Sequence, residues 1–79
     1  MTRDEVFKII DDERHYQEQK WGSDEGKSLG DFLVYMEYYL RIAKDSYSTD
    51  KFEQTKTFLR KAVAVGVAAM ELHGVPKRN

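Results

Sequence analysis

The run from Ala62 to Met70 contains only apolar or small residues. It lies inside a longer stretch, Phe52–His73, in which apolar side chains recur every three or four residues, as on one face of an α-helix. A helix that is apolar all round has to be covered all round, and a 79-residue chain has few other segments that can cover it. We therefore expect this helix to form the floor of a small core that is shared with another copy of the chain.

Signals at the helix ends predict an all-α fold. The expected helices span residues 3–20, 29–45 and 51–73. Before the first helix, Thr2 and Glu5 have the spacing of a capping box, in which each side chain binds the backbone N–H of the other residue. Ser28 and Asp31 repeat this spacing before the second helix.

The third helix is expected to carry end signals of its own. Asp50 with Glu53 can cap its start. Gly74 fits a left-handed residue just past its end, where Val75 would touch Met70 in a Schellman arrangement. Residues 1–79 contain no repeat and no sign of a second domain, so we expect a single helical domain.

The second helix has two apolar faces. One is a heptad seam, thickened by Phe32, that consists of Leu29, Leu33, Met36, Leu40 and Ala43. The other, on the far side, consists of Val34, Tyr35, Tyr38 and Ile42. One seam can serve the core of a monomer, whereas the second face needs a partner such as another copy. The sequence therefore predicts a homo-oligomeric helical bundle.

Composition excludes several classes of protein. Thirteen Lys and Arg against fourteen Asp and Glu give a net charge of −1, without the basic excess of a nucleic-acid-binding domain. There is no Cys, which is typical of a reducing compartment. The charged N-terminus does not resemble a signal peptide, and the longest apolar run is far below the roughly 20 residues that a membrane span needs. We expect a soluble, cytoplasmic protein.

The motif E-R-H-Y-Q-E-Q-K-W-G, residues 13–22, contains the strongest candidate for a ligand site. Helical spacing places Arg14, Gln17, Lys20 and Trp21 near the stripe of Val6 and Ile10, where the first helix would meet the others. Arg and Lys suit phosphate oxygens, Gln suits the edge of a base, and Trp offers a stacking surface. The structural alternative is that Trp21 fills the core and the polar residues only satisfy buried groups.

Arg14 needs an anion if it is buried there, because an unpaired buried guanidinium is strongly disfavoured. Glu13 or Glu37 would serve in the structural alternative, and a ligand phosphate would serve in the functional one.

The motifs along the chain resemble those of a known group of proteins. E-R-x-Y-Q-x-x-K-W-G, then G-D-F-L-V-Y-M-E-Y-Y-L and F-L-R-K-A-V-A-V-G-V-A-A-M-E-L-H-G-V-P, are similar to motifs of small uncharacterised phage and prophage proteins. That group is distantly similar to the all-α nucleotide pyrophosphohydrolases of the MazG type. The resemblance implies a helical oligomer. In MazG-type enzymes, E-x-x-E on one helix and E-x-x-D on the next bind magnesium, and triphosphates are cleaved between the α and β phosphates.

This metal motif does not carry over to the present chain. Glu37 could be the first glutamate, but Leu40 stands three residues later and Arg41 four. The third helix has Arg60 and Lys61 where acids should be. One carboxylate cannot gather Mg²⁺, whereas these cations would attract phosphate directly. We therefore predict no catalytic residue, no metal and no cofactor.

The function expected from the sequence is that of a non-catalytic, phage-type accessory protein that binds, and by binding sequesters, a nucleotide-like phosphorylated small molecule. A host defence signal would be one such ligand, in the cytoplasm of the host cell. The candidate ligand-binding residues are Arg14, Gln17, Lys20, Trp21, Glu13, Tyr16, Arg41 and Arg60. One alternative is a Mg²⁺-dependent, MazG-like hydrolase, and another is an interaction module that docks on a host protein through its tyrosine-rich second helix.

Overall fold

Three α-helices make up most of the chain in this computed structural model, which describes residues 1–78. The helices are α1 (Arg3–Trp21), α2 (Leu29–Ser48) and α3 (Phe52–His73). These residues include no β-strand, so the predicted all-α class and the order of the helices are confirmed. The clearest difference in bounds is at the end of α2, which continues to Ser48 rather than stopping at residue 45.

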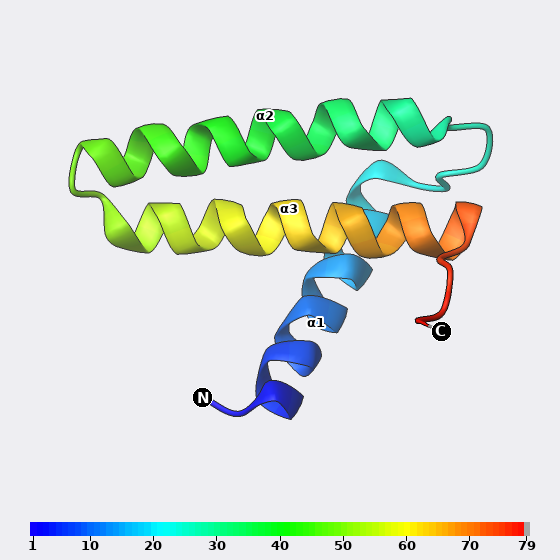
Figure 1. The fold of residues 1–79 in the computed structure, drawn as a ribbon, viewed down its shortest axis with the longest axis horizontal. Helices are drawn as coiled ribbons and strands as arrows, with labels where there is room; N and C mark the ends of the chain where they lie inside the picture. The colour runs from blue at the N-terminus through cyan, green and yellow to red at the C-terminus, as the bar shows by residue number, and fades with distance from the viewer. Residues whose placement is uncertain (79) are drawn as a thin grey trace.

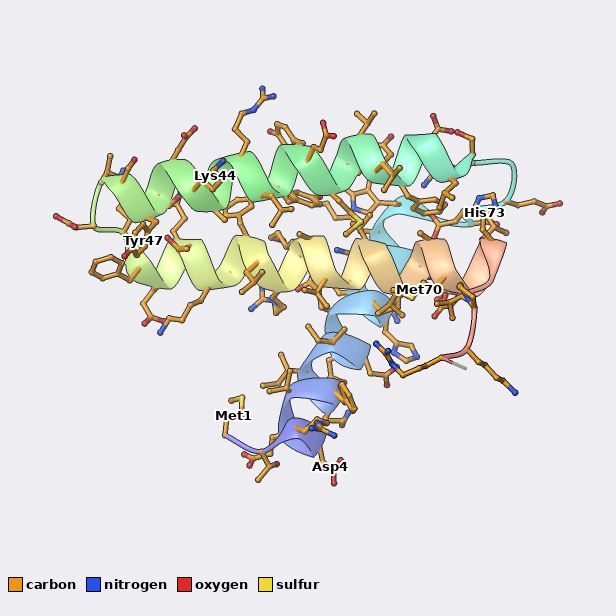
Figure 2. All side chains as sticks on the ribbon, in the orientation of Figure 1. Met1, Asp4, Lys44, Tyr47, Met70 and His73 are labelled. Atoms are coloured by element: carbon orange, nitrogen blue, oxygen red, sulfur yellow. The ribbon has the colours of Figure 1, made fainter. Side chains whose placement is uncertain are left out.

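The helices are arranged as a hairpin with one helix crossing it. α2 and α3 lie side by side and antiparallel, joined by a short turn (Figure 1). α1 packs on α3 and makes no close backbone contact with α2. The first turn of α1, with Asp4, and Met1 just before it project away from the hairpin (Figure 2). The prediction that Val6 packs where α1 meets the other helices is therefore wrong, because Val6 is 40% exposed.

Both predicted capping boxes are present. The Thr2 hydroxyl accepts the Glu5 N–H at 3.1 Å, and a Glu5 carboxylate oxygen accepts the Thr2 N–H at 3.0 Å. The bond from the Thr2 backbone lowers the pKa of Glu5, because it favours the charged carboxylate. At the start of α2, Ser28 and Asp31 exchange the same two bonds at 3.1 and 2.8 Å. Local sequence alone sets these helix starts.

The predicted ends of α3 are corrected by the structure. Lys51, rather than Asp50, is the N-cap, and it makes no side-chain capping bond. Asp50 instead lies in the turn between α2 and α3, where it has a positive φ of 62°. Hydrogen bonds from the backbone N–H groups of residues 50 and 51 to carbonyls of α2 close this turn. Gly74 has the expected positive φ of 84°, but its ψ of 171° is extended, so no left-handed Schellman cap forms.

The interface between α2 and α3 shares Phe32, Met36 and Ala43 with the predicted heptad seam, but it does not use the leucines of that seam. The buried or half-buried positions that follow one stripe of α2 are Phe32, Met36, Tyr39, Ala43 and Ser46. Leu29, Leu33 and Leu40 are 50%, 53% and 39% exposed, so the leucine seam is not the core of the monomer. The Phe32 ring packs on Ala68 and Ala69 of α3, where a flat ring fits a surface of small residues.

Small residues of α3 allow both other helices to approach closely. Its buried positions are Ala62, Ala64, Gly66, Ala68 and Ala69. At Gly66, an added Cβ would lie 3.2 Å from the Cε atom of Met36 on α2. Several larger side chains of α3 lie outside the interface, with Leu59 49% and Met70 47% exposed. The core is therefore thin and is formed mainly by alanines.

Substitutions at Gly66 should measure how tightly α2 and α3 pack. Gly66→Ala should leave the melting temperature unchanged or raise it, because the flexible end of Met36 can shift and Ala favours helix by about 1 kcal/mol. Gly66→Leu should cost about 1–3 kcal/mol through overpacking. Melting curves followed by circular dichroism measure both effects. Val63→Leu, at a 41% exposed position of the same helix, is the control, and equal stability of the two leucine variants would contradict close packing at Gly66.

Candidate functional site

A layer of charged and polar side chains lies where α1 crosses α3. Arg14 is 9% exposed, and its Nε and Nη2 atoms lie 3.0 and 2.8 Å from a Glu71 carboxylate oxygen. Nη2 also donates to Asp24 in the α1–α2 loop at 3.3 Å. The expectation that Arg14 must find an anion is thus confirmed. The predicted protein partners, Glu13 and Glu37, are wrong, because Glu71 reaches Arg14 from the far end of α3.

Glu13 belongs to the same layer but pairs with α3. It is 6% exposed, and its Oε1 atom accepts a hydrogen bond from Arg60 at 2.7 Å. Its Oε2 atom is buried with no hydrogen-bond partner among the described residues, and the Lys61 ammonium lies 3.9 Å away. One turn further along α1, the Gln17 amide donates to the Lys61 carbonyl at 3.2 Å. Ion pairs between α1 and α3 therefore help to set the orientation of α1 across α3.

A cavity of about 550 Å³ opens beside this layer, between the end of α1, the α1–α2 loop, α2 and α3. Most of its wall is aromatic or aliphatic, and a few polar groups converge on it. The lining residues are Arg14, Gln17, Trp21, Asp24, Lys27, Phe32, Val34, Tyr35, Tyr38, Tyr39, Val65 and Ala68. A volume of this size suits a small organic molecule.

The aromatic part of the wall comes from α1 and α2. Trp21 is 62% exposed and forms part of the wall, so the structural alternative is wrong where it places Trp21 in the core. Its other part is confirmed, because Glu13, Arg14 and Gln17 are buried and bind partners within the protein. Tyr35 and Tyr38 come from the outer apolar face of α2, which borders the cavity. Tyr39 lies deeper, and burial raises the pKa of its hydroxyl, with the charge of Glu13 acting in the same direction. The Tyr39 hydroxyl is therefore a neutral donor at physiological pH.

The polar part of the wall is centred on the α1–α2 loop. Asp24 Oδ1 lies 2.7 Å from the Lys27 ammonium, while Oδ2 faces Arg14. The Lys27 ammonium also lies 5.9 Å from the centre of the Tyr35 ring. His73 holds the loop at the end of α3, where its Nε2 atom is 2.9 Å from the Lys27 carbonyl (Figure 2). Two cations and one carboxylate thus lie next to an aromatic wall.

The structure brings together some of the residues that the sequence predicted for a ligand site. Arg14, Gln17 and Trp21 line the cavity. Lys20 is outside the lining, with its ammonium 5.1 Å from the centre of the Trp21 ring and 5.8 Å from that of Tyr16. Tyr16 is exposed beside it.

The remaining predicted residues lie elsewhere. Glu13 and Arg60 pair with each other outside the lining, and Arg41 is exposed on α2. Sequence reasoning missed Asp24 and Lys27, although a charged pair three residues apart in a glycine-flanked loop was visible in the sequence.

No metal centre is evident in the described part of the chain, since residues 1–78 contain no group of three or more His, Cys, Asp or Glu that could hold an ion. In the same residues, no helix is long and apolar enough to cross a membrane. Comparison with known proteins gives no match to a protein family, to a curated protein or to a solved structure.

Proposed function

We propose that this chain is a non-catalytic binding protein that captures a nucleotide-like, phosphorylated small molecule in the aromatic cavity. The observation that carries the proposal is the cavity of about 550 Å³ whose wall combines Trp21 and Tyr35 with Arg14 and Lys27. Ligand pockets in proteins have this size and this mixture of a mostly apolar lining with a few convergent polar groups.

Each part of the wall suits one part of a nucleotide. Aromatic side chains such as Trp21 and Tyr38 can stack on a base, which contributes about 1–3 kcal/mol for each base stacked. The guanidinium of Arg14 and the ammonium of Lys27 suit phosphate oxygens. The Gln17 amide nitrogen is engaged by the Lys61 carbonyl, which leaves its oxygen as an acceptor for the edge of a base.

The biological role that we propose is sequestration. The sequence motifs resemble those of phage and prophage proteins, and a phage accessory protein that holds a host defence signal would need capture without turnover. The absence of the MazG-type metal motif from the sequence at Glu37, Leu40 and Arg41 supports capture over hydrolysis.

We also propose that the binding protein is a homo-oligomer. Large apolar side chains remain exposed on all three helices, on the projecting half of α1, on the leucine seam of α2 and on the outside of α3. They include Val6, Phe7, Ile9, Leu29, Leu33, Leu40, Leu59, Val63 and Met70. Such an extent of exposed apolar surface is unusual for a soluble monomer. A second copy would cover it and would add to a thin alanine core.

Light scattering at micromolar concentration should give a mass that is a multiple of 9.3 kDa. Phe7→Glu, on the projecting half of α1, should shift the mass downwards, because a buried charge without a partner opposes association. His15→Glu, which adds a carboxylate at an exposed position on the polar face of the same helix, should leave the mass unchanged. A wild-type monomer that melts cooperatively would contradict the proposed assembly.

The binding function is tested by thermal melts and calorimetry with the common nucleoside mono- and triphosphates, using the corresponding nucleosides as uncharged controls. We expect a concentration-dependent rise in melting temperature with at least one phosphorylated compound and a smaller rise with its nucleoside. Release of pyrophosphate with Mg²⁺ that Glu37→Gln abolishes would favour the MazG-like alternative. Capture of a host protein without any small-molecule ligand would favour the interaction module.

A further inference from the structure

The carboxylate of Asp24 bridges the two cations of the cavity wall. Its Oδ1 atom lies 2.7 Å from the Lys27 ammonium, and its Oδ2 atom lies 3.3 Å from Nη2 of Arg14. The side chain is 17% exposed, and all three residues line the cavity. A tetrahedral oxyanion between an Arg and a Lys would make the same pair of contacts.

We propose that the carboxylate of Asp24 occupies the phosphate-binding position of the cavity when no ligand is bound. It holds the anion position of the cavity in the free protein, and a bound phosphate takes its place between Arg14 and Lys27. This inference rests on the proposed function and adds to it a residue that sets the affinity and the selectivity of the site. To displace Asp24, a ligand must carry a group that binds the two cations more strongly than one carboxylate does.

The α1–α2 loop should allow the Asp24 side chain to move out of the cavity while the three helices stay in place. It connects α1 to α2 through Gly22 and Gly26, which have φ values of 80° and 87°, and a Cβ added at either glycine would meet no atom within 4 Å. The Asp24 side chain contacts only Arg14 and Lys27 among the ion pairs of the described residues. Arg14 stays oriented after Asp24 departs, because two of its nitrogens bind Glu71.

The greater negative charge of a phosphate monoester favours its replacing the Asp24 carboxylate between Arg14 and Lys27. Such a group carries a charge of about −1.5 to −2 at neutral pH and offers three acceptor oxygens, against one charge and two oxygens for Asp24. The released carboxylate regains water at the cavity mouth. A monoanionic carboxylate ligand gains no charge advantage over Asp24, so the wild-type site should discriminate against it.

The test compares Asp24→Asn with a matched control, Glu25→Gln. Both substitutions remove one negative charge from the same loop, but Glu25 does not line the cavity. Calorimetry with the tightest-binding nucleoside 5′-monophosphate should give an affinity about tenfold or more higher for Asp24→Asn than for the wild type, because a competing charged hydrogen bond has been removed. Glu25→Gln should stay within about twofold of the wild type, and affinity for the uncharged nucleoside should be the same in all three proteins.

Hydrogen exchange on the wild type supplies a second readout that needs no variant to fold. The Lys27 N–H donates to the Asp24 carbonyl at 3.1 Å in the closed loop. Saturation with the nucleotide should accelerate exchange at residues 24–27 if Asp24 is displaced.

The outcomes separate the inference from the proposed function. Nucleotide binding with equal affinity in Asp24→Asn and the wild type, or with unchanged loop exchange, would overturn the inference and leave the binding function standing. Failure of every protein to bind any nucleotide would overturn both.

Discussion

Arg60→Ala is expected to destabilise the fold by about 3 kcal/mol, because it strands a buried carboxylate. Glu13 is 6% exposed and accepts its only side-chain hydrogen bond within the described residues from Arg60. Its second oxygen has no such bond to compensate. We place the cost at the lower end of the range for broken buried pairs, since the Lys61 ammonium, 3.9 Å from that oxygen, can move closer.

A double-mutant cycle identifies the cause of this loss. Glu13→Gln in the Arg60→Ala background should recover most of the stability, because the stranded charge is removed while the shape is kept. Lys56→Ala is the matched control on the same helix: it breaks an exposed pair with Glu53 and should cost less than about 1 kcal/mol. Urea unfolding is measured for five proteins: the wild type, Arg60→Ala, Glu13→Gln, the double variant and Lys56→Ala. Equal costs for Arg60→Ala and Lys56→Ala would show that Glu13 does not depend on Arg60.

Arg14→Ala is expected to cost about 2–3 kcal/mol and to abolish nucleotide binding. The structural cost is limited, because Glu71 is 52% exposed and can turn to water, and Asp24 keeps its contact with Lys27. The loss of binding follows from the removal of the guanidinium that is proposed to hold phosphate. Both effects come from one side chain, so a second variant is needed to separate them.

Arg14→Lys separates stability from binding. A lysine keeps the positive charge beside the carboxylates of Glu18, Asp24 and Glu71 but lacks the planar fork that binds two oxygens at once. We expect this variant to fold with a smaller loss of stability than Arg14→Ala and to bind nucleotide more weakly than the wild type. Melting curves with and without nucleotide measure both properties. A melting temperature of Arg14→Ala at or above that of the wild type would contradict the internal pairing with Glu71 and Asp24.

Features fixed by a few neighbouring residues could be predicted from the sequence. The capping boxes at Thr2 and Ser28 depend only on residues three positions away, and both are present. The start of α3 could not be predicted in this way. Asp50 has the chemistry of a cap, but the turn that closes the α2–α3 hairpin places it at a positive φ instead.

Features that depend on contacts between distant segments were harder to predict. On α2, the predicted heptad seam and the buried stripe have Phe32, Met36 and Ala43 in common. Only the contact with the alanines of α3 shows that the leucines of the seam lie outside the interface. Arg14 meets Glu71, 57 residues away, through a helix crossing that no periodicity specifies. Asp24 and Lys27 lie in a loop. The periodic spacing of apolar residues, which shows the faces of a helix, does not show which side chains of a loop face a cavity.

The central claim, that a nucleotide binds in the aromatic cavity, is tested most directly by the fluorescence of Trp21. It is the only tryptophan in the chain and lies in the cavity wall, so its emission reports on this site alone. Titration with each of the common nucleoside 5′-monophosphates should give saturable quenching for at least one of them. Tyr38→Ala, which removes another aromatic ring from the cavity lining, should weaken binding. Tyr47→Ala, at the far end of α2 (Figure 2), should not. Quenching that never saturates and that matches free tryptophan in all three proteins would contradict the claim.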